Sequence, residues 1–164
     1  MTTGTKSNAG LEGVVATSSA ICYIDGERGV LTYAGYDIHE LAQSATFEEV
    51  CFLLWHRRLP TRSELGDLRT ELASARRLPE AILRLCRMLP AGNAMATLRT
   101  LVSALSHHDS DQDEVSESAA YSKAVRLTAQ VGSLVATYGR IGAGGGPIEP
   151  DPALGHAANF LLML

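Results

Sequence analysis

The stretch Tyr23–Ala42, YIDGERGVLTYAGYDIHELA, decides the fold expected for this chain. The residues Ser19–Asp25 have the pattern of a strand whose side chains alternate between two faces, and a second strand pattern follows at Val30–Tyr33. An Asp-Gly pair between two such runs is typical of a β-hairpin. From Asp37 onward the apolar residues recur with helical spacing. The sequence therefore predicts one small hairpin near residues 19–34 in a chain that is otherwise all-α.

Capping residues mark the first predicted helix starts. A capping side chain stands three residues before a glutamate at Asp37–Glu40, Thr46–Glu49 and Thr61–Glu64. This capping-box spacing satisfies two backbone N–H groups that the first turn of a helix leaves free. Because an isolated hairpin is marginal in water, it must lie against the helices. Further helices are expected from Leu78-Pro79 to Leu89, over Ala94–Ser106, from about Glu117 to Ile141, and over Ala153–Leu164.

The apolar stripes of these helices are expected to face a common core. In Ala94–Ser106 the second face carries small residues, and Leu127–Tyr138 carries no charge. We expect these two segments to share one helical layer, with one of them meeting a second subunit. The expected stripes are Phe47, Val50, Cys51 and Leu54; Leu65, Leu68 and Leu72; Ile82, Leu83, Leu85, Cys86 and Leu89; Met95, Leu98, Leu101, Val102 and Leu105; and Ala120, Ala124, Leu127, Val131, Leu134, Val135 and Tyr138.

The composition is that of a single globular domain. The chain has 164 residues, of which 46% are hydrophobic and 20% charged, with a net charge of −4. No block rich in Lys or Arg is present, so nucleic acid and anionic membranes are not expected partners. The apolar runs are too short to span a bilayer. We expect a disordered lead at residues 1–10, a helical domain at 11–164, and a cytoplasmic location.

Few residues suggest a chemical site. Cys22, Cys51 and Cys86 lack metal-ligand spacing and are expected to be buried thiols. His39 and His56 are expected on the surface, and His156 in a core or an interface. The glycines of 142–146 lack the Lys-Ser/Thr of a phosphate loop and should end a helix.

The segment with His107, His108, Asp109, Asp111 and Asp113 imitates the start of a calcium loop. That motif requires Gly at its sixth position and Glu at its twelfth, where this chain has Glu and Ala. A solvated acidic loop is therefore expected. No catalytic, cofactor-binding or metal site follows from composition and spacing.

The chain nevertheless resembles the citrate synthase family, in the form of bacterial citrate and 2-methylcitrate synthases. The resemblance runs from about Gly10 to Leu164, and the hairpin block is its most specific part. Ala34 stands where the family pattern has Arg, and Ala94 and Ala96 stand where it has Pro and Asp. The matching segments are GLEGV, YIDG, YAGY, ELA, FEEV with LLW, LPTRSEL, AMATLRTLVSAL and PDPALGHAANFLLML.

The resemblance implies the first half of the citrate synthase large domain. The family condenses acetyl-CoA or propionyl-CoA with oxaloacetate and water, using an aspartate base and two histidines in segments that have no match in 1–164. The chain alone is therefore expected to be inactive, to bind no cofactor, and to need a second copy or a complementary C-terminal segment. Ala157, Phe160, Leu161 and Leu164 should form an exposed apolar patch. A non-catalytic dimerisation or regulatory module built on the same fold is the alternative.

Overall fold

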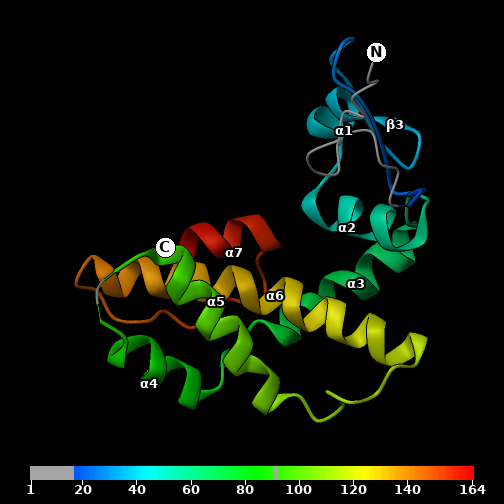
Figure 1. The fold of residues 1–164 in the computed structure, drawn as a ribbon. Helices are drawn as coiled ribbons and strands as arrows, with labels where there is room; N and C mark the ends of the chain where they lie inside the picture. The colour runs from blue at the N-terminus through cyan, green and yellow to red at the C-terminus, as the bar shows by residue number, and fades with distance from the viewer. Residues whose placement is uncertain (1–16, 91) are drawn as a thin grey trace, which may run out of the picture.

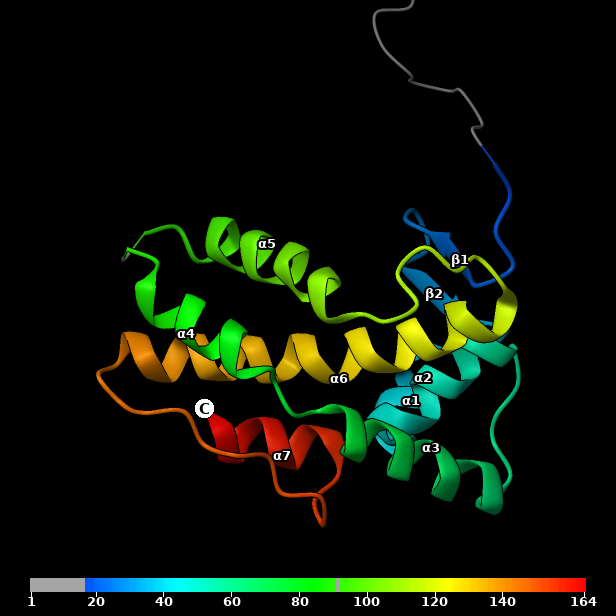
Figure 2. The ribbon, with the colours of Figure 1, turned by 90° about the horizontal axis from the view of Figure 1, so that it is seen from below.

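The computed structural model describes residues 17–90 and 92–164, so the lead predicted at residues 1–10 lies outside the described residues. Within the described part the chain is mainly helical, as predicted. A small sheet with α1 and α2 lies at one end, and α4, α5 and α7 surround the long helix α6 at the other (Figure 1, Figure 2). The helices are α1 (Ile38–Ser44), α2 (Phe47–His56), α3 (Arg62–Ala75), α4 (Glu80–Met88), α5 (Ala94–Leu105), the 3₁₀ turn η1 (Ser106–His108), α6 (Glu117–Gly142) and α7 (His156–Met163).

The predicted hairpin is present and carries one extra strand. β1 (Cys22–Asp25) and β2 (Val30–Tyr33) pair antiparallel. β3 (Tyr36–Asp37) adds to the other side of β2, so the strand order is β1-β2-β3. Two residues are too few to show an alternating pattern, which is why β3 was not predicted. Gly35 between β2 and β3 has a φ of 91°, a value that favours glycine.

Two of the three capping boxes form as predicted. The side chains of Thr46 and Thr61 each accept a hydrogen bond from the backbone N–H three residues on. The carboxylate of the glutamate at that position accepts a hydrogen bond from the backbone N–H of the threonine. Asp37 instead caps α1 by accepting from the N–H of His39 at 2.7 Å. The predicted box with Glu40 was therefore wrong, because the Asp side chain bonds the N–H two residues on.

The predicted start of the last helix was also wrong. α7 begins at His156, three residues after the predicted start at Ala153. The Asp151 carboxylate accepts from the Ala153 N–H at 2.8 Å, and the Asp151 carbonyl accepts from the Leu154 N–H. An Asp side chain that bonds its own backbone two residues on favours a turn over a helix.

Two apolar clusters form the core, and α6 contributes to both. One cluster joins α4, α5 and α6 and contains Leu78, Ile82, Cys86, Leu101, Leu105 and Leu134. The other joins α2, α3 and α6 and contains Phe52, Leu68, Leu72, Val125 and Ala129. Because Leu101 and Leu105 of α5 share a cluster with Leu134 of α6, the predicted layer of α5 and α6 is confirmed. The predicted contact with a second subunit stays a prediction.

The predicted core stripes of α2, α5 and α6 were partly wrong. In α5, Met95 is 71% exposed. In α6, Leu127 is 44% exposed and Val135 is also exposed, whereas small residues such as Ala129, Ser133 and Ala136 are buried. In α2, Phe52 and Leu53 are buried and Phe47 is exposed. A small buried face allows neighbouring helices to come close, so bulk alone did not identify the core side of α6.

Helix α7 lies along this small face of α6. A Cβ added at Gly132 would meet Nε2 of His156 at 3.1 Å, and one added at Gly139 would meet Cδ1 of Leu164 at 3.2 Å. The residue numbers of the two contacts increase in the same direction along both helices, so α6 and α7 run parallel. The outer face of α7 is exposed: Leu161 is 70% exposed, and Ala157 is exposed as well. Leu164, next to Gly139 of α6, is also partly open to solvent. The predicted apolar patch is confirmed for these residues, whereas Phe160 is half-buried.

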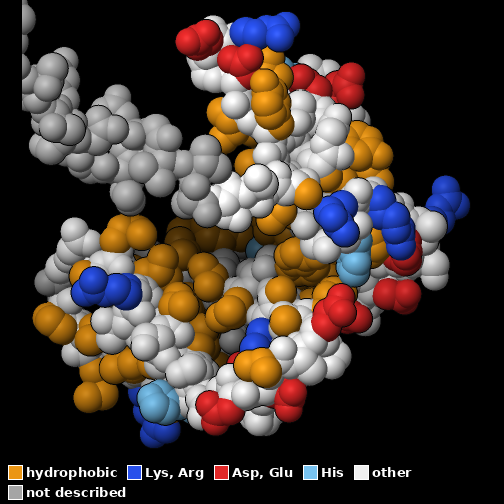
Figure 3. Space-filling view, turned by 45° about the vertical axis from the view of Figure 1, so that its right-hand side comes forward, with side chains coloured by type: hydrophobic (Ala, Val, Ile, Leu, Met, Phe, Trp, Pro, Cys, Tyr) orange, Lys and Arg blue, Asp and Glu red, His pale blue; other side chains and the backbone are white. Residues whose placement is uncertain are grey.

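Apolar side chains gather around a hollow between the hairpin end and the α4–α7 end of the molecule (Figure 3). No helix among residues 17–90 and 92–164 is both long and apolar enough to cross a membrane.

Candidate functional site

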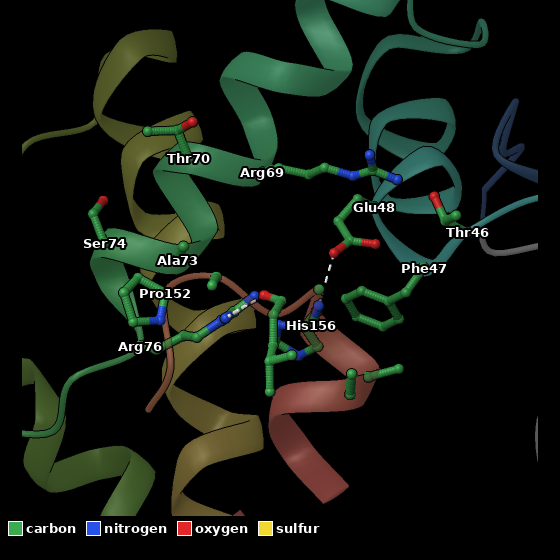
Figure 4. Close-up of a pocket in the computed structure, with 15 residues that line it drawn as sticks. Thr46, Phe47, Glu48, Arg69, Thr70, Ala73, Ser74, Arg76, Pro152 and His156 are labelled. Carbon is green, nitrogen blue, oxygen red and sulfur yellow. Dashed lines mark hydrogen bonds between the residues drawn. The ribbon is translucent and has the colours of Figure 1, made fainter. Parts of the chain in front are cut away.

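A hollow of about 700 Å³ lies between α2, α3 and α7 (Figure 4). The first turn of α2 forms one wall, α3 forms a second, and the loop before α7 closes the third. Charged and aromatic side chains from all three elements meet here. The residues that line the hollow include Thr46, Phe47, Glu48, Thr70, Ser74, Arg76 and His156.

Glu48 joins α2 to α7 across this hollow. Its side chain is only 4% exposed, and Oε1 accepts from the backbone N–H of His156 at 2.8 Å. Figure 4 shows this bond as a dashed line. The residue before α7, Gly155, supplies no side-chain cap. A carboxylate from the first turn of another helix therefore caps α7. Its negative charge is stabilising there because it lies at the positive end of the helix dipole.

Arg76 holds the loop before α7 from the opposite side. It follows the last turn of α3, is 1% exposed, and donates through Nη1 to the carbonyls of Asp151 and Leu154 at 3.1 and 2.8 Å. Burial lowers the pKa of its guanidinium, while the charges of Glu48 and Asp151 act in the opposite direction. Buried charges persist in proteins when opposite charges compensate them. Glu48 and Asp151 supply that compensation.

His156 packs its ring against α2. The imidazole stacks on the ring of Phe47 with 4.4 Å between centroids and 9° between planes. Burial lowers the pKa of His156 below its ordinary value, and the nearby charge of Arg76 lowers it further. The neutral form of the ring is therefore favoured. Its Nδ1 is buried and has no hydrogen-bond partner among the described residues.

The hydroxyl groups of the hollow bond to helix groups. Thr46 serves the capping box of α2, Thr70 donates to the carbonyl of Gly66, and Ser74 donates to the carbonyl of Glu71. A nucleophilic hydroxyl requires a base within hydrogen-bond reach, and these hydroxyls have backbone partners or the Glu49 carboxylate of the box. The arrangement can fix α7 against α2 and α3, but it contains no activated nucleophile.

The other histidines are exposed, as predicted for His39 and His56. The ring of His56 lies against that of Phe52, with 4.2 Å between centroids and 36° between planes. His107 and His108 lie in the exposed turn η1. Within the described residues no group of three or more His, Cys, Asp or Glu side chains could hold a metal ion.

The loop between η1 and α6 is bound to α6 by charged side chains. Asp109 and Asp111 both pair with Nη2 of Arg126 on α6, and the three side chains are half-buried. Lys123, three residues earlier on α6, donates to the carbonyls of Gln112 and Glu114. The expectation of a solvated loop was therefore wrong for these two aspartates, because opposite charges on α6 hold them.

The prediction of buried thiols is confirmed for Cys86 and only partly for Cys51. Cys86 is buried and Cys51 is half-buried, where desolvation raises the pKa of the Cys51 thiol to about 11. Cys22 is exposed, so the prediction that it is buried was wrong. Cys22 lies on β1, at the edge of the sheet. The glycines after residue 141 end α6, as predicted.

Comparison with known proteins assigns the chain to a protein family. A family model described as "Citrate synthase, C-terminal domain" matches residues 10–164. The chain belongs to the citrate synthase family. It is 46% identical to the citrate synthase of Haloferax volcanii, over 94% of this chain and 42% of that protein. It is 38% identical to the 2-methylcitrate synthase of Mycobacterium tuberculosis, over 94% of this chain and 39% of that protein.

Solved structures of the family have the same fold. The crystal structure of citrate synthase from Pyrobaculum aerophilum matches with a TM-score of 0.87 and 37% identity, over 93% of this chain and 40% of that one. The structure from Thermotoga maritima matches with a TM-score of 0.80 and 34% identity. The chain thus spans about two fifths of the length of these relatives. The predicted family and fold class are confirmed.

Proposed function

We propose that this chain forms the first portion of the helical domain of a citrate synthase-type acyltransferase. The reaction of such an enzyme condenses acetyl-CoA or propionyl-CoA with oxaloacetate and water, and it releases citrate or methylcitrate and CoA. The observation that carries this proposal is the common fold over 93% of the chain at a TM-score of 0.87 with 37% identity.

In this proposal residues 1–164 serve as scaffold, and the reacting groups come from the rest of the enzyme. The condensation requires a base beside the methyl group of the thioester and a donor beside its carbonyl oxygen. The polar residues between α2, α3 and α7 do not provide that pair, because Glu48 caps α7 and Arg76 bonds loop carbonyls. The chain by itself should therefore not turn over the two substrates.

The exposed apolar faces indicate the partners of this scaffold. Leu161 and Leu162 on α7 are exposed, and exposed apolar surface of this kind is typical of an interface. We propose that the remainder of the enzyme covers this face. On α5 the small residues Ala96, Thr100 and Ser103 are exposed, which would allow a helix of a second copy to pack closely. The cytoplasmic location stays a prediction.

A non-catalytic helical module is the second candidate. The observation in its favour is that the centres of both core clusters are closed within the chain: Leu72, Leu101 and Leu134 are fully buried without any further polypeptide. A segment with a closed core can fold and act by itself. This candidate predicts a stable chain that shows no dependence on a complementary segment.

A thiol-release assay with acetyl-CoA and oxaloacetate distinguishes the two. The purified chain is measured alone and after co-refolding with the uncovered part of the Haloferax volcanii citrate synthase. We expect no turnover by the chain alone and turnover by the mixture. A stable complex without turnover would favour the non-catalytic module, and turnover by the chain alone would refute the assignment of a scaffold role.

A further inference from the structure

The outer edge of β1 has free backbone groups. The register pairs Tyr23 with Thr32, and the Ala34 N–H donates to the Ile21 carbonyl at 2.8 Å. Hydrogen-bonded pairs alternate along an antiparallel ladder, so Ile21, Tyr23 and Asp25 bond towards β2. The N–H and C=O groups of Cys22 and Ile24 therefore point away from the sheet, at an edge that has no neighbouring strand among the described residues.

Side chains on both faces of β1 are apolar and exposed. Ile24 is 69% exposed and Tyr23 is 59% exposed, and they belong to opposite faces of the strand. Exposed sheet edges are usually protected by charged residues, prolines or bulges. The run Ser19–Ile24 contains no charged residue and no proline. The Asp25 carboxylate bonds the N–H groups of Glu27 and Arg28 in the turn, so it does not shield the edge.

The other edge of the sheet, at β3, is less suited to the addition of a strand. β3 has only two residues, and the side chain of Asp37 is used to cap α1. The sheet therefore has one edge at which a strand can be added. Such strand addition obtains affinity from main-chain hydrogen bonds and specificity from alternate side chains.

We propose that the free edge of β1 is the docking site for an extended segment with alternating apolar residues, contributed by the part of the citrate synthase polypeptide that lies outside residues 1–164. This inference rests on the proposed function. The Haloferax volcanii enzyme is covered to only 42% by this chain, so the larger part of such a polypeptide is available to supply the strand. A second copy is a poorer occupant, because the four residues of β1 bury far less than the roughly 800 Å² per partner of a stable interface. A tethered segment does not require that area.

Hydrogen exchange followed by NMR tests this docking site. The probes are overlapping 14-residue synthetic peptides that cover the unmatched part of the Haloferax volcanii citrate synthase. We expect one of them to slow exchange at the amides of Cys22 and Ile24, while the amide of Tyr23, which already bonds β2, changes little. Peptides that bind α5 or α7 but leave these two amides unprotected would overturn this inference while supporting the proposed function.

Two variants at one position separate backbone from side-chain recognition. Ile24→Pro removes an outward N–H, whereas Ile24→Ala keeps it and shortens the side chain. Loss of one hydrogen bond should weaken peptide binding by about fivefold to tenfold in the Pro variant, and by less in the Ala variant. Retained protection of the Tyr23 amide shows that β1 and β2 remain paired. Equal binding by both variants, no binding by any peptide, or self-association of the chain that only Ile24→Pro abolishes would overturn the proposal.

Discussion

The Glu48→Ala substitution should detach α7 from α2. Glu48 is 4% exposed, and it is the side chain that caps the first N–H of α7. Loss of a cap costs about 0.5–2 kcal/mol. Arg76, which is 1% exposed, would also lose one of its two compensating charges. A buried guanidinium that loses such a partner lowers the free energy of unfolding by about 1–3 kcal/mol. We expect the free energy of unfolding to fall by about 2–4 kcal/mol, which lies around the sum of the middle values of these two ranges.

This cost is smaller than the about 3–5 kcal/mol for removing one partner of a directly bonded buried pair. Arg76 keeps both carbonyl bonds and the charge of Asp151 in the variant. The substitution Glu48→Gln keeps an oxygen that can accept from His156 and should cost about half as much. Glu27→Ala in the exposed turn of the hairpin is the matched control and should stay within about 0.5 kcal/mol of the wild type.

Urea unfolding and amide hydrogen exchange measure the two consequences. The unfolding midpoint should shift in the order Glu48→Ala, Glu48→Gln and Glu27→Ala, from the largest effect to the smallest. Amides of α7 should exchange about 30-fold to several-hundred-fold faster in Glu48→Ala, as expected for a local loss of about 2–4 kcal/mol. If Glu48→Ala behaves like the control and α7 exchange is unchanged, the reasoning about the tertiary cap is wrong.

Further predictions concern α6, the loop before it, α3 and the pH dependence. Gly132→Ala should lower the thermal unfolding midpoint relative to Gly142→Ala, because its Cβ would lie 3.1 Å from Nε2 of His156, whose ring is stacked on Phe47, whereas position 142 has open space. Arg126→Ala should release the preceding loop, seen as faster limited proteolysis there. Thr61→Ala should cost about 1 kcal/mol by loss of the α3 cap, measured by urea unfolding. The pKa of His156 is lower in the folded chain than its ordinary value of 6.5. The contribution of His156 to the free energy of unfolding is therefore present above pH 6.5 and is lost as the pH falls through the folded pKa. His156→Gln should make the free energy of unfolding less dependent on pH in this acidic range.

Local features of the fold followed from the sequence. The hairpin depends on alternation and an Asp-Gly turn within twelve or so residues, and the capping boxes at Thr46 and Thr61 depend on neighbours three residues apart. Such signals act within one element. The start of α7 was misplaced because the loop before it is also held by Arg76, a distant residue that bonds the backbone carbonyls of Asp151 and Leu154.

The candidate site depended on long-range contacts that the sequence does not reveal. Glu48 contacts a helix more than 100 residues away, and Arg76 bonds carbonyls more than 70 residues away. Both residues stand in segments whose pattern is typical of exposed helix surface. The one available signal for Glu48 is its position four residues before the buried Phe52, on the same helix face. The pairing of Asp109 with Arg126 was missed in the same way.

A chimaeric enzyme provides the most direct test of the central claim. Residues 10–164 of this chain would replace the matching segment of the Haloferax volcanii citrate synthase, to which the chain is 46% identical. The rate of CoA thiol release from acetyl-CoA and oxaloacetate is then compared with that of the unmodified enzyme. The account predicts a folded chimaera with substantial turnover, because the segment supplies the family scaffold and the recipient supplies the reacting groups. A chimaera that folds and assembles but shows no turnover would contradict it.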